Sequence, residues 1–112
     1  MASVRLEKVS SLLKRELSTS FQRGMSVHYQ GVMITVTQVR VSPDLGLAKV
    51  YLSFFPADKR EATLELVQNR TVLIRKELAA EVSKQLRKVP DLSFYLDDSL
   101  DYFEEIDRLL KG

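Results

Sequence analysis

Residues 74–98, IRKELAAEVSKQLRKVPDLSFYLDD, decide the fold because they join a basic amphipathic helix to a half-buried strand. Apolar residues recur every four positions from Ile74 to Leu86, which is the spacing of one helix face. Pro90 ends the predicted helix, since proline lacks a backbone N–H and disfavours helical geometry in the residue before it. From residue 92 to residue 96, apolar and polar side chains alternate, which predicts a strand buried on one face.

The predicted helix has a second face that is rich in cations. It carries Arg75, Lys76, Lys84, Arg87 and Lys88. Clustered cations suit a nucleic acid, because neutralising phosphates needs positive charge and no catalytic geometry. The alternative is a solvated helix face on which nearby glutamates pair with these cations at helical spacing. The pattern alone leaves both interpretations open.

A first amphipathic helix is predicted for residues 3–21, and its apolar stripe consists of Leu6, Val9, Leu13 and Leu17. Arg5, Lys8 and Arg15 lie off this stripe and would extend the cationic surface if the two helices are adjacent. Gly24 is expected to stop this first helix.

Residues 32–55 predict an antiparallel β-hairpin. The apolar alternation shifts phase after Val36, which indicates either a β-bulge or a strand end covered on both sides. In the turn SPDLG (residues 42–46), proline presets φ, Asp44 can bond its own backbone, and Gly46 is expected to adopt a positive φ. The inner face of the returning strand consists of Ala48, Val50, Leu52 and Phe54.

The helices after the hairpin complete an α+β domain. Asp58 is the predicted cap of a second helix, and the poor helix formers at residues 69–72 leave open whether the second and third helices are separate or form one bent helix. Residues 99–112 are predicted to form a short acidic C-terminal helix. We therefore expect a single domain over residues 1–112, in the order α-β-β-α-α-β plus this helix, with a three-stranded sheet covered by helices on one face.

The composition narrows the possible classes of function. A chain of 112 residues buries a modest core with little room for a deep substrate cavity, which argues against an enzyme. The absence of cysteine excludes disulfides, thiolate metal sites and thiol catalysis. Four glycines, none in a phosphate-binding pattern, exclude a Walker loop, a dinucleotide fingerprint and the GXXG loop of ordinary KH domains. The first twenty residues contain no apolar run typical of a signal peptide or membrane span, so we expect a cytoplasmic protein.

Individual residues offer no catalytic site. His28 has no second histidine with which to form a metal set or a catalytic pair, so a surface or turn role is favoured over a metal ligand. Asp97 and Asp98 are adjacent, and neighbouring strand residues face opposite ways, which favours a helix cap over acid–base catalysis. Tyr51 and Tyr95 are suited to stacking on bases, but sheet tyrosines more often cover neighbouring strands. We expect no catalytic residues, no metal and no cofactor.

The charge is distributed unevenly along the chain. Residues 1–90 contain 15 Lys and Arg against 8 Asp and Glu, whereas residues 91–112 contain 2 against 7. The body of the chain therefore carries a net charge of +7 and its end a net charge of −5. A basic body suggests a polyanionic partner, although an excess of solvated lysine would give the same balance.

Three segments resemble bacterial ribosome-binding factor A in order and spacing. These are ITVTQVRVSPDLGLAKVYLSFF, LIRKEL and LRKVPDLSFYLDDSLDYFEEIDRLL, which together span most of the chain. The resemblance implies a KH-like fold of the second type and a non-enzymatic factor that binds the free small (30S) ribosomal subunit through 16S rRNA. It also implies a role in late maturation of that subunit and in rRNA processing. Where the family usually carries an Ala-x-Gly kink, this chain reads Arg70-Thr71-Val72, so the bend between the helices is expected to form differently.

Two functions follow as hypotheses. In the first, a monomer binds RNA through the third helix and the start of the first, with eight contact residues: Arg5, Lys8, Arg15, Arg75, Lys76, Lys84, Arg87 and Lys88. In the second, the chain is a protein-interaction adaptor that docks through its acidic C-terminal helix or its exposed sheet face.

Overall fold

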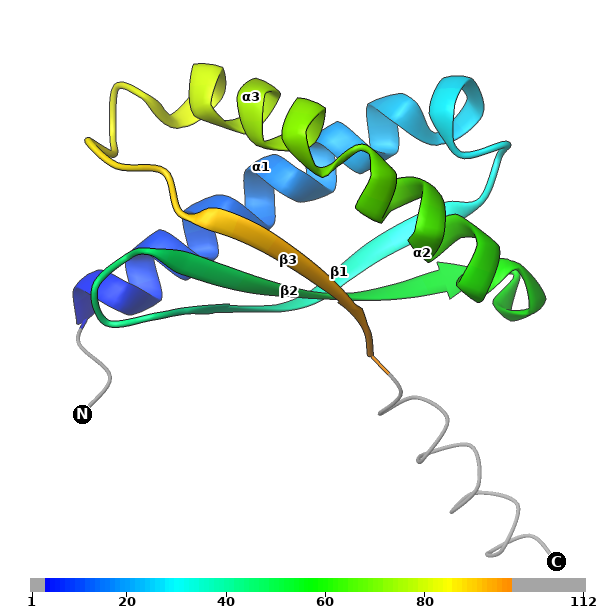
Figure 1. The fold of residues 1–112 in the computed structure, drawn as a ribbon, viewed down its shortest axis with the longest axis horizontal. Helices are drawn as coiled ribbons and strands as arrows, with labels where there is room; N and C mark the ends of the chain where they lie inside the picture. Colours follow the sequence, from blue (N-terminus) through cyan, green and yellow to red (C-terminus); the bar gives the residue numbers. More distant parts are fainter. Residues whose placement is uncertain (1–3, 98–112) are drawn as a thin grey trace, which may run out of the picture.

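The computed structural model describes residues 4–97. These residues form a three-stranded sheet with helices on one face (Figure 1). The elements are α1 (Val4–His28), β1 (Met33–Val41), β2 (Leu47–Phe55), the short 3-10 helix η1 (Ala57–Lys59), α2 (Arg60–Asn69), α3 (Thr71–Val82) and β3 (Asp91–Leu96). The predicted order α-β-β-α-α-β is confirmed. The predicted C-terminal helix at residues 99–112 lies outside the described residues.

The sheet has the order β1-β2-β3, with β1 and β2 antiparallel and β3 parallel to β2. The register between β1 and β2 shifts between Val36 and Gln38, so a β-bulge explains the change of phase in the apolar pattern. The hydroxyl of the bulged Thr37 lies 3.2 Å from the carbonyl oxygen of Tyr51, and it also donates to the carboxylate of Asp97. Asp97 thus has a structural hydrogen bond at the end of β3.

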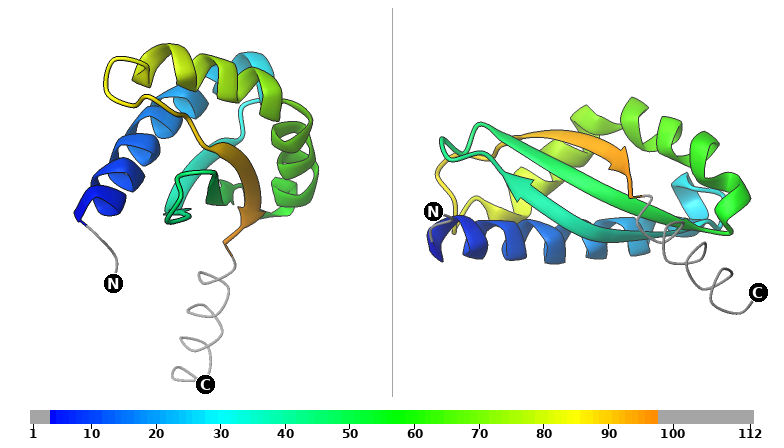
Figure 2. Two further views of the ribbon diagram at one scale, coloured as in Figure 1. Left: turned by 60° about the vertical axis from the view of Figure 1, so that its left-hand side comes forward. Right: turned by 90° about the horizontal axis from the view of Figure 1, so that it is seen from below.

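The core lies between the sheet and the helices, which cover one face of the sheet (Figure 2). The predicted inner face of β2 is confirmed, because all four of its side chains are buried. The stripes of α1 and α3 that meet the core consist of Val9, Leu13, Leu17 and Phe21 and of Ile74, Leu78 and Val82. Burying these large apolar side chains holds the cationic faces of the helices outward.

The hairpin turn differs from prediction at one residue. Leu45, and not Gly46, adopts the positive φ, at 60°. The carboxylate of Asp44 accepts hydrogen bonds from the Ser42 hydroxyl at 2.7 Å and from the Gly46 N–H at 3.0 Å. These bonds stabilise the turn and allow a non-glycine residue to carry the left-handed conformation.

Helix α1 continues past Gly24 to His28, so the predicted stop was wrong. Gly24 is buried, and a Cβ at this position would lie 3.1 Å from Cε2 of Tyr29. The glycine therefore permits the close approach of an aromatic ring, whereas the reversal of the chain falls at Gln30 and Gly31, both of which have positive φ.

The second helix does not begin at an Asp58 capping box. Residues 57–59 instead form η1, and α2 starts at Arg60 with no side-chain cap on Lys59. The segment at residues 69–72, for which the sequence left one bent helix or two helices open, separates two helices. Arg70 is the C-cap of α2 and the N-cap of α3, and its backbone, with φ −101° and ψ 10°, is not helical.

Helix α3 ends at Val82, and not near Pro90 as predicted. Residues 83–89 form turns and bends instead. The reason lies in the sheet: the N–H of Asp91 donates to the carbonyl oxygen of Gly46 at 3.0 Å, so β3 must start beside the hairpin turn. A helix rising 1.5 Å per residue would carry the chain straight past that point. Leu86 still packs against the core, but from this connection.

Candidate nucleic-acid interface

The N-terminal end of α1, the hairpin turn and residues 85–88 lie at the left of Figure 1. Side chains from these three segments line one cationic hollow. Its volume is about 670 Å³. Four of the predicted contact residues line it: Arg5, Lys8, Arg87 and Lys88. All four are exposed. Segments that are about eighty residues apart in sequence thus contribute cations to one surface.

The floor of the cationic hollow is apolar. It is formed by the buried Val9 and by Leu12, Leu45 and Leu86, which pack partly buried against the core. Lysine and arginine stems cover apolar surface while their charged groups stay in water. The hollow is therefore anchored to the core and presents its charge outward.

Asp44, in the hairpin turn, interacts electrostatically with Lys88 of the cationic hollow. The pKa of Asp44 is lowered from its ordinary value of 3.8, first by the hydrogen bond from the Ser42 hydroxyl and next by the Gly46 N–H, with a smaller contribution from Lys88. Asp44 therefore stays ionised within the turn and attracts Lys88 weakly, without forming an ion pair with it among the described residues.

Arg15 and Lys84 lie near the cationic hollow without lining it. Arg15, with Lys8, lines a shallower depression along α1, and its guanidinium lies 3.5 Å from the carboxylate of Glu16. Lys84 is exposed in the turn directly after α3, next to Gln85, which lines both depressions. These two cations lie beside the residues of the cationic hollow and extend its positive surface.

Arg75 and Lys76 do not join this surface. The guanidinium of Arg75 donates to the carbonyl oxygens of Val89 at 2.7 Å and Pro90 at 3.1 Å, and it lies 3.4 Å from the carboxylate of Asp91. Arg75 therefore holds the connection between α3 and β3. Lys76 is exposed on α3, away from the residues of the cationic hollow.

Sequence reasoning missed the contribution of the hairpin turn. Leu45 is far in sequence from the start of α1 and from residues 85–88, and no local pattern indicates that they meet. The only available signal was the pairing of β2 with β3, which brings residue 91 to the hairpin turn and carries residues 85–88 with it.

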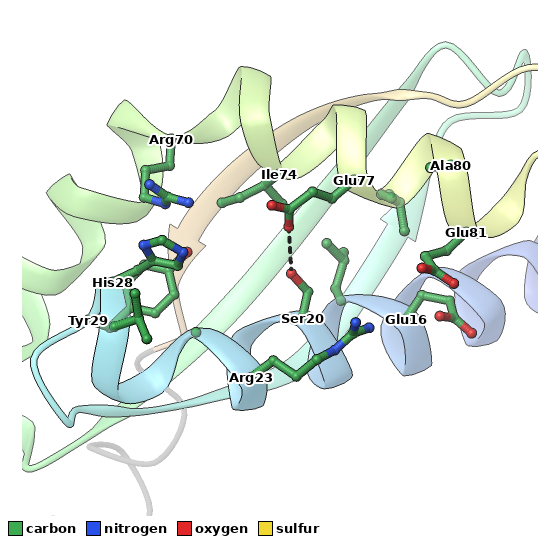
Figure 3. A pocket seen from close by; sticks show the side chains of 14 residues that line it. Glu16, Ser20, Arg23, His28, Tyr29, Arg70, Ile74, Glu77, Ala80 and Glu81 are labelled. Carbon is green, nitrogen blue, oxygen red and sulfur yellow. Dashed lines mark hydrogen bonds between the residues drawn. The ribbon is translucent and has the colours of Figure 1, made fainter.

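A second hollow, of about 380 Å³, lies between α1 and α3, and it carries both signs of charge (Figure 3). Arg23, His28 and Arg70 contribute positive or titratable groups, and the acidic groups are Glu16, Glu77 and Glu81. The Ser20 hydroxyl donates to Glu77 across the hollow at 3.4 Å. Its glutamates would repel a phosphate backbone, which makes the cationic hollow the better nucleic-acid site.

Tyr29 closes one end of this second hollow beside Arg70. Burial raises the pKa of the Tyr29 phenol above its ordinary value of 10.0, although Arg70 opposes the shift. The phenol stays neutral at physiological pH and packs against Phe21, with ring centroids 5.7 Å apart. Tyr29 therefore belongs to the core.

Residues 4–97 lack the features of a metal site or of a membrane-spanning helix. Within this range, no group of three or more histidine, aspartate or glutamate side chains is placed to hold a metal ion. Of the helices described, none is long and apolar enough to cross a membrane.

Known sequences place these features in a family. The profile of the family described as Ribosome-binding factor A matches residues 5–110. Proteins named Ribosome-binding factor A are similar over the whole chain: that of Flavobacterium psychrophilum is 41% identical, with 100% of this chain and 87% of the relative covered. That of Flavobacterium johnsoniae is 43% identical with the same coverage.

Solved structures agree with these sequence matches. The crystal structure of ribosome-binding factor A from Thermus thermophilus superposes with a TM-score of 0.68 at 25% identity, covering 81% of this chain and 94% of that chain. A homology model of the Thermus thermophilus factor, fitted into the cryo-EM map of a 30S–RbfA complex, gives 0.65 at 26% identity, with 80% and 91% covered. The shared fold is α+β, as the sequence pattern predicted, and KH-like, as the family resemblance implied. The chain belongs to the ribosome-binding factor A family.

Proposed function

We propose that this protein binds the free small ribosomal subunit through 16S rRNA and assists its late maturation and rRNA processing. In this proposal the chain acts as one domain and as a cytoplasmic monomer, without catalysis or a cofactor. Family membership supports the proposal, as does the related Thermus thermophilus factor that was fitted into the map of a 30S complex. What the chain itself contributes is a surface shaped and charged for RNA.

The observation that carries the proposal is the meeting of Arg5, Lys8, Arg87 and Lys88 around one hollow. None of these four cations forms an ion pair with another described residue, so their charge is available to phosphates. Each phosphate contact releases condensed counterions, which favours binding without any base-specific geometry. A maturation factor that recognises folded rRNA by shape and charge needs such a surface.

Charge reversal at this surface tests the proposal. We expect Arg87→Glu with Lys88→Glu to abolish co-sedimentation with purified free small subunits, because the change of four charge units replaces attraction by repulsion. Lys59→Glu with Arg60→Glu is the matched control. It makes the same charge change at exposed positions at the start of α2, away from the cationic hollow.

Thermal denaturation should show both variants folded, since exposed substitutions usually change stability by about 0.5 kcal/mol or less. The proposed surface is wrong if the Arg87/Lys88 variant pellets with subunits as the parent does. The proposed function itself is wrong if the parent does not associate with free small subunits at all. Association that persists after the rRNA is digested would instead favour the adaptor hypothesis.

A further inference from the structure

The face of the sheet that points away from the helices carries aromatic and cationic side chains together. Its outward residues include Arg40, Lys49, Tyr51 and Tyr95, with Met33 and Phe55 at the far end of the hairpin. Phe55 is 69% exposed, Met33 51% and Tyr95 39%. Among the described residues, no helix covers this face (Figure 2).

Tyr51 and Tyr95 form a preformed aromatic surface. They are paired across β2 and β3, and their rings stack with centroids 5.6 Å apart and an interplanar angle of 30°. The Ser93 hydroxyl donates to the Tyr95 hydroxyl at 2.7 Å, which orients that ring. Rings held in place before binding lose little conformational entropy when a base stacks on them.

Arg40 and Lys49 are directly opposite each other in the register of β1 and β2. Like charges in a cross-strand pair are destabilising. Neither cation forms an ion pair with a described residue, although the Arg40 guanidinium lies 5.8 Å from the ring centroid of Tyr51. This arrangement costs stability in the free protein, and an anion bound between the two cations would offset that cost.

From the cation pair beside the stacked rings, we infer that the open sheet face binds single-stranded RNA. A base stacks on the exposed side of Tyr95, which Tyr51 supports from behind, while phosphates lie against Arg40 and Lys49. Proteins hold single strands by this combination of stacking and charge. An apolar protein partner would explain Phe55 and Met33 but not the opposed cations. The apolar alternation of β2 predicts Lys49 and Tyr51 on this outward face, but only the strand register shows that Arg40 lies opposite Lys49.

The open face and the cationic hollow adjoin through the hairpin turn. Arg40 and Lys49 flank the turn at residues 42–46, and Leu45 in that turn lines the cationic hollow. A single strand crossing the turn would therefore contact both surfaces. The inference rests on the proposed function and adds to it a class of ligand, unpaired rRNA, and a second contact surface.

Binding of a 5′-labelled octauridylate to the full chain, followed by fluorescence anisotropy at one fixed salt concentration, tests this inference. We expect Tyr51→Leu with Tyr95→Leu to weaken binding at least about fivefold, because stacking contributes on the order of 1–3 kcal/mol per base. Tyr51→Phe with Tyr95→Phe is the matched control, which keeps both rings, loses only the orienting bond from Ser93, and should bind more tightly than the leucine pair. Arg40→Gln with Lys49→Gln should weaken binding about tenfold without unfolding the chain.

The inference is overturned if the glutamine pair binds octauridylate as tightly as the parent, a result that does not depend on the leucine variant folding. If that variant binds octauridylate as the parent does and still sediments with subunits, the inference fails but the proposed function stands. Octauridylate binding through this face by a parent that does not sediment with subunits would refute the proposed function and retain the RNA site. If the glutamine pair loses subunit association but not octauridylate binding, the face contacts a ribosomal protein and the RNA assignment is wrong.

Discussion

At the scale of single residues, Asp44 links the hairpin turn to the charge of the cationic hollow. Its carboxylate accepts the Ser42 hydroxyl and the Gly46 N–H, and both bonds favour the ionised form. The folded-state pKa is therefore lower than the ordinary value of 3.8. The stability contributed by the ionised carboxylate is present above the unfolded-state pKa and is lost as the pH falls through the lowered folded-state pKa.

We predict that an NMR titration of the Asp44 carboxyl gives a midpoint below that of an ordinary aspartate, and that Ser42→Ala raises it. The reason is that removing the Ser42 hydroxyl removes the largest cause of the shift. Ser93→Ala, on the open sheet face, should leave the midpoint unchanged. A midpoint that does not move in Ser42→Ala would show that the turn does not hold the carboxylate through this bond.

At the scale of elements, the connection from α3 to β3 decides where the cations go. Residues 74–98 correctly predicted a helix followed by a strand, because the apolar period is a local property, but the helix does not extend to Pro90. Where α3 ends was not predictable in this way. The Lys84–Arg87 stretch continues the helical pattern, but the parallel pairing of β3 with β2 requires the chain to turn back at Val82.

The same limit explains the other differences from prediction. Gly24 looks like a helix stop in sequence, yet its role is to admit the ring of Tyr29, a contact created by the chain reversal at Gln30. For the site, sequence reasoning identified the cations but could not tell those that bind carbonyl oxygens from those that remain available. Arg75 is in the first group and Arg87 in the second.

We predict that Arg75→Ala lowers the free energy of unfolding by about 1–3 kcal/mol, since hydrogen bonds from a charged group contribute on the order of 1.5–3 kcal/mol and this side chain is partly exposed. Urea unfolding measures the change. Lys76→Ala, its exposed neighbour, should change stability by about 0.5 kcal/mol or less. If Arg75→Ala is as stable as the parent but binds subunits weakly, then Arg75 contacts RNA and does not tether the connection.

At the scale of the whole molecule, the fold gathers basic residues from distant segments at one end of the sheet. The +7 balance of residues 1–90 did not locate them, because net charge carries no positional information. The structure locates four of them around the cationic hollow. This hollow lies beside the hairpin turn, which separates it from the open sheet face. In the proposed function, binding to the small subunit therefore depends on one property, the neutralisation of its phosphates by the cations of this hollow.

The dependence of subunit affinity on salt tests that property most directly. The four cations of the cationic hollow alone contribute about −3 to the log–log slope, at about 0.7 per phosphate on single strands, and Arg87→Gln with Lys88→Gln should make the slope about 1.4 less steep. The same pair of changes at Lys59 and Arg60 should leave the slope as it is in the parent. An equal slope for the parent and the Arg87/Lys88 variant would contradict the account, because it would show that these two cations release no counterions when the subunit binds.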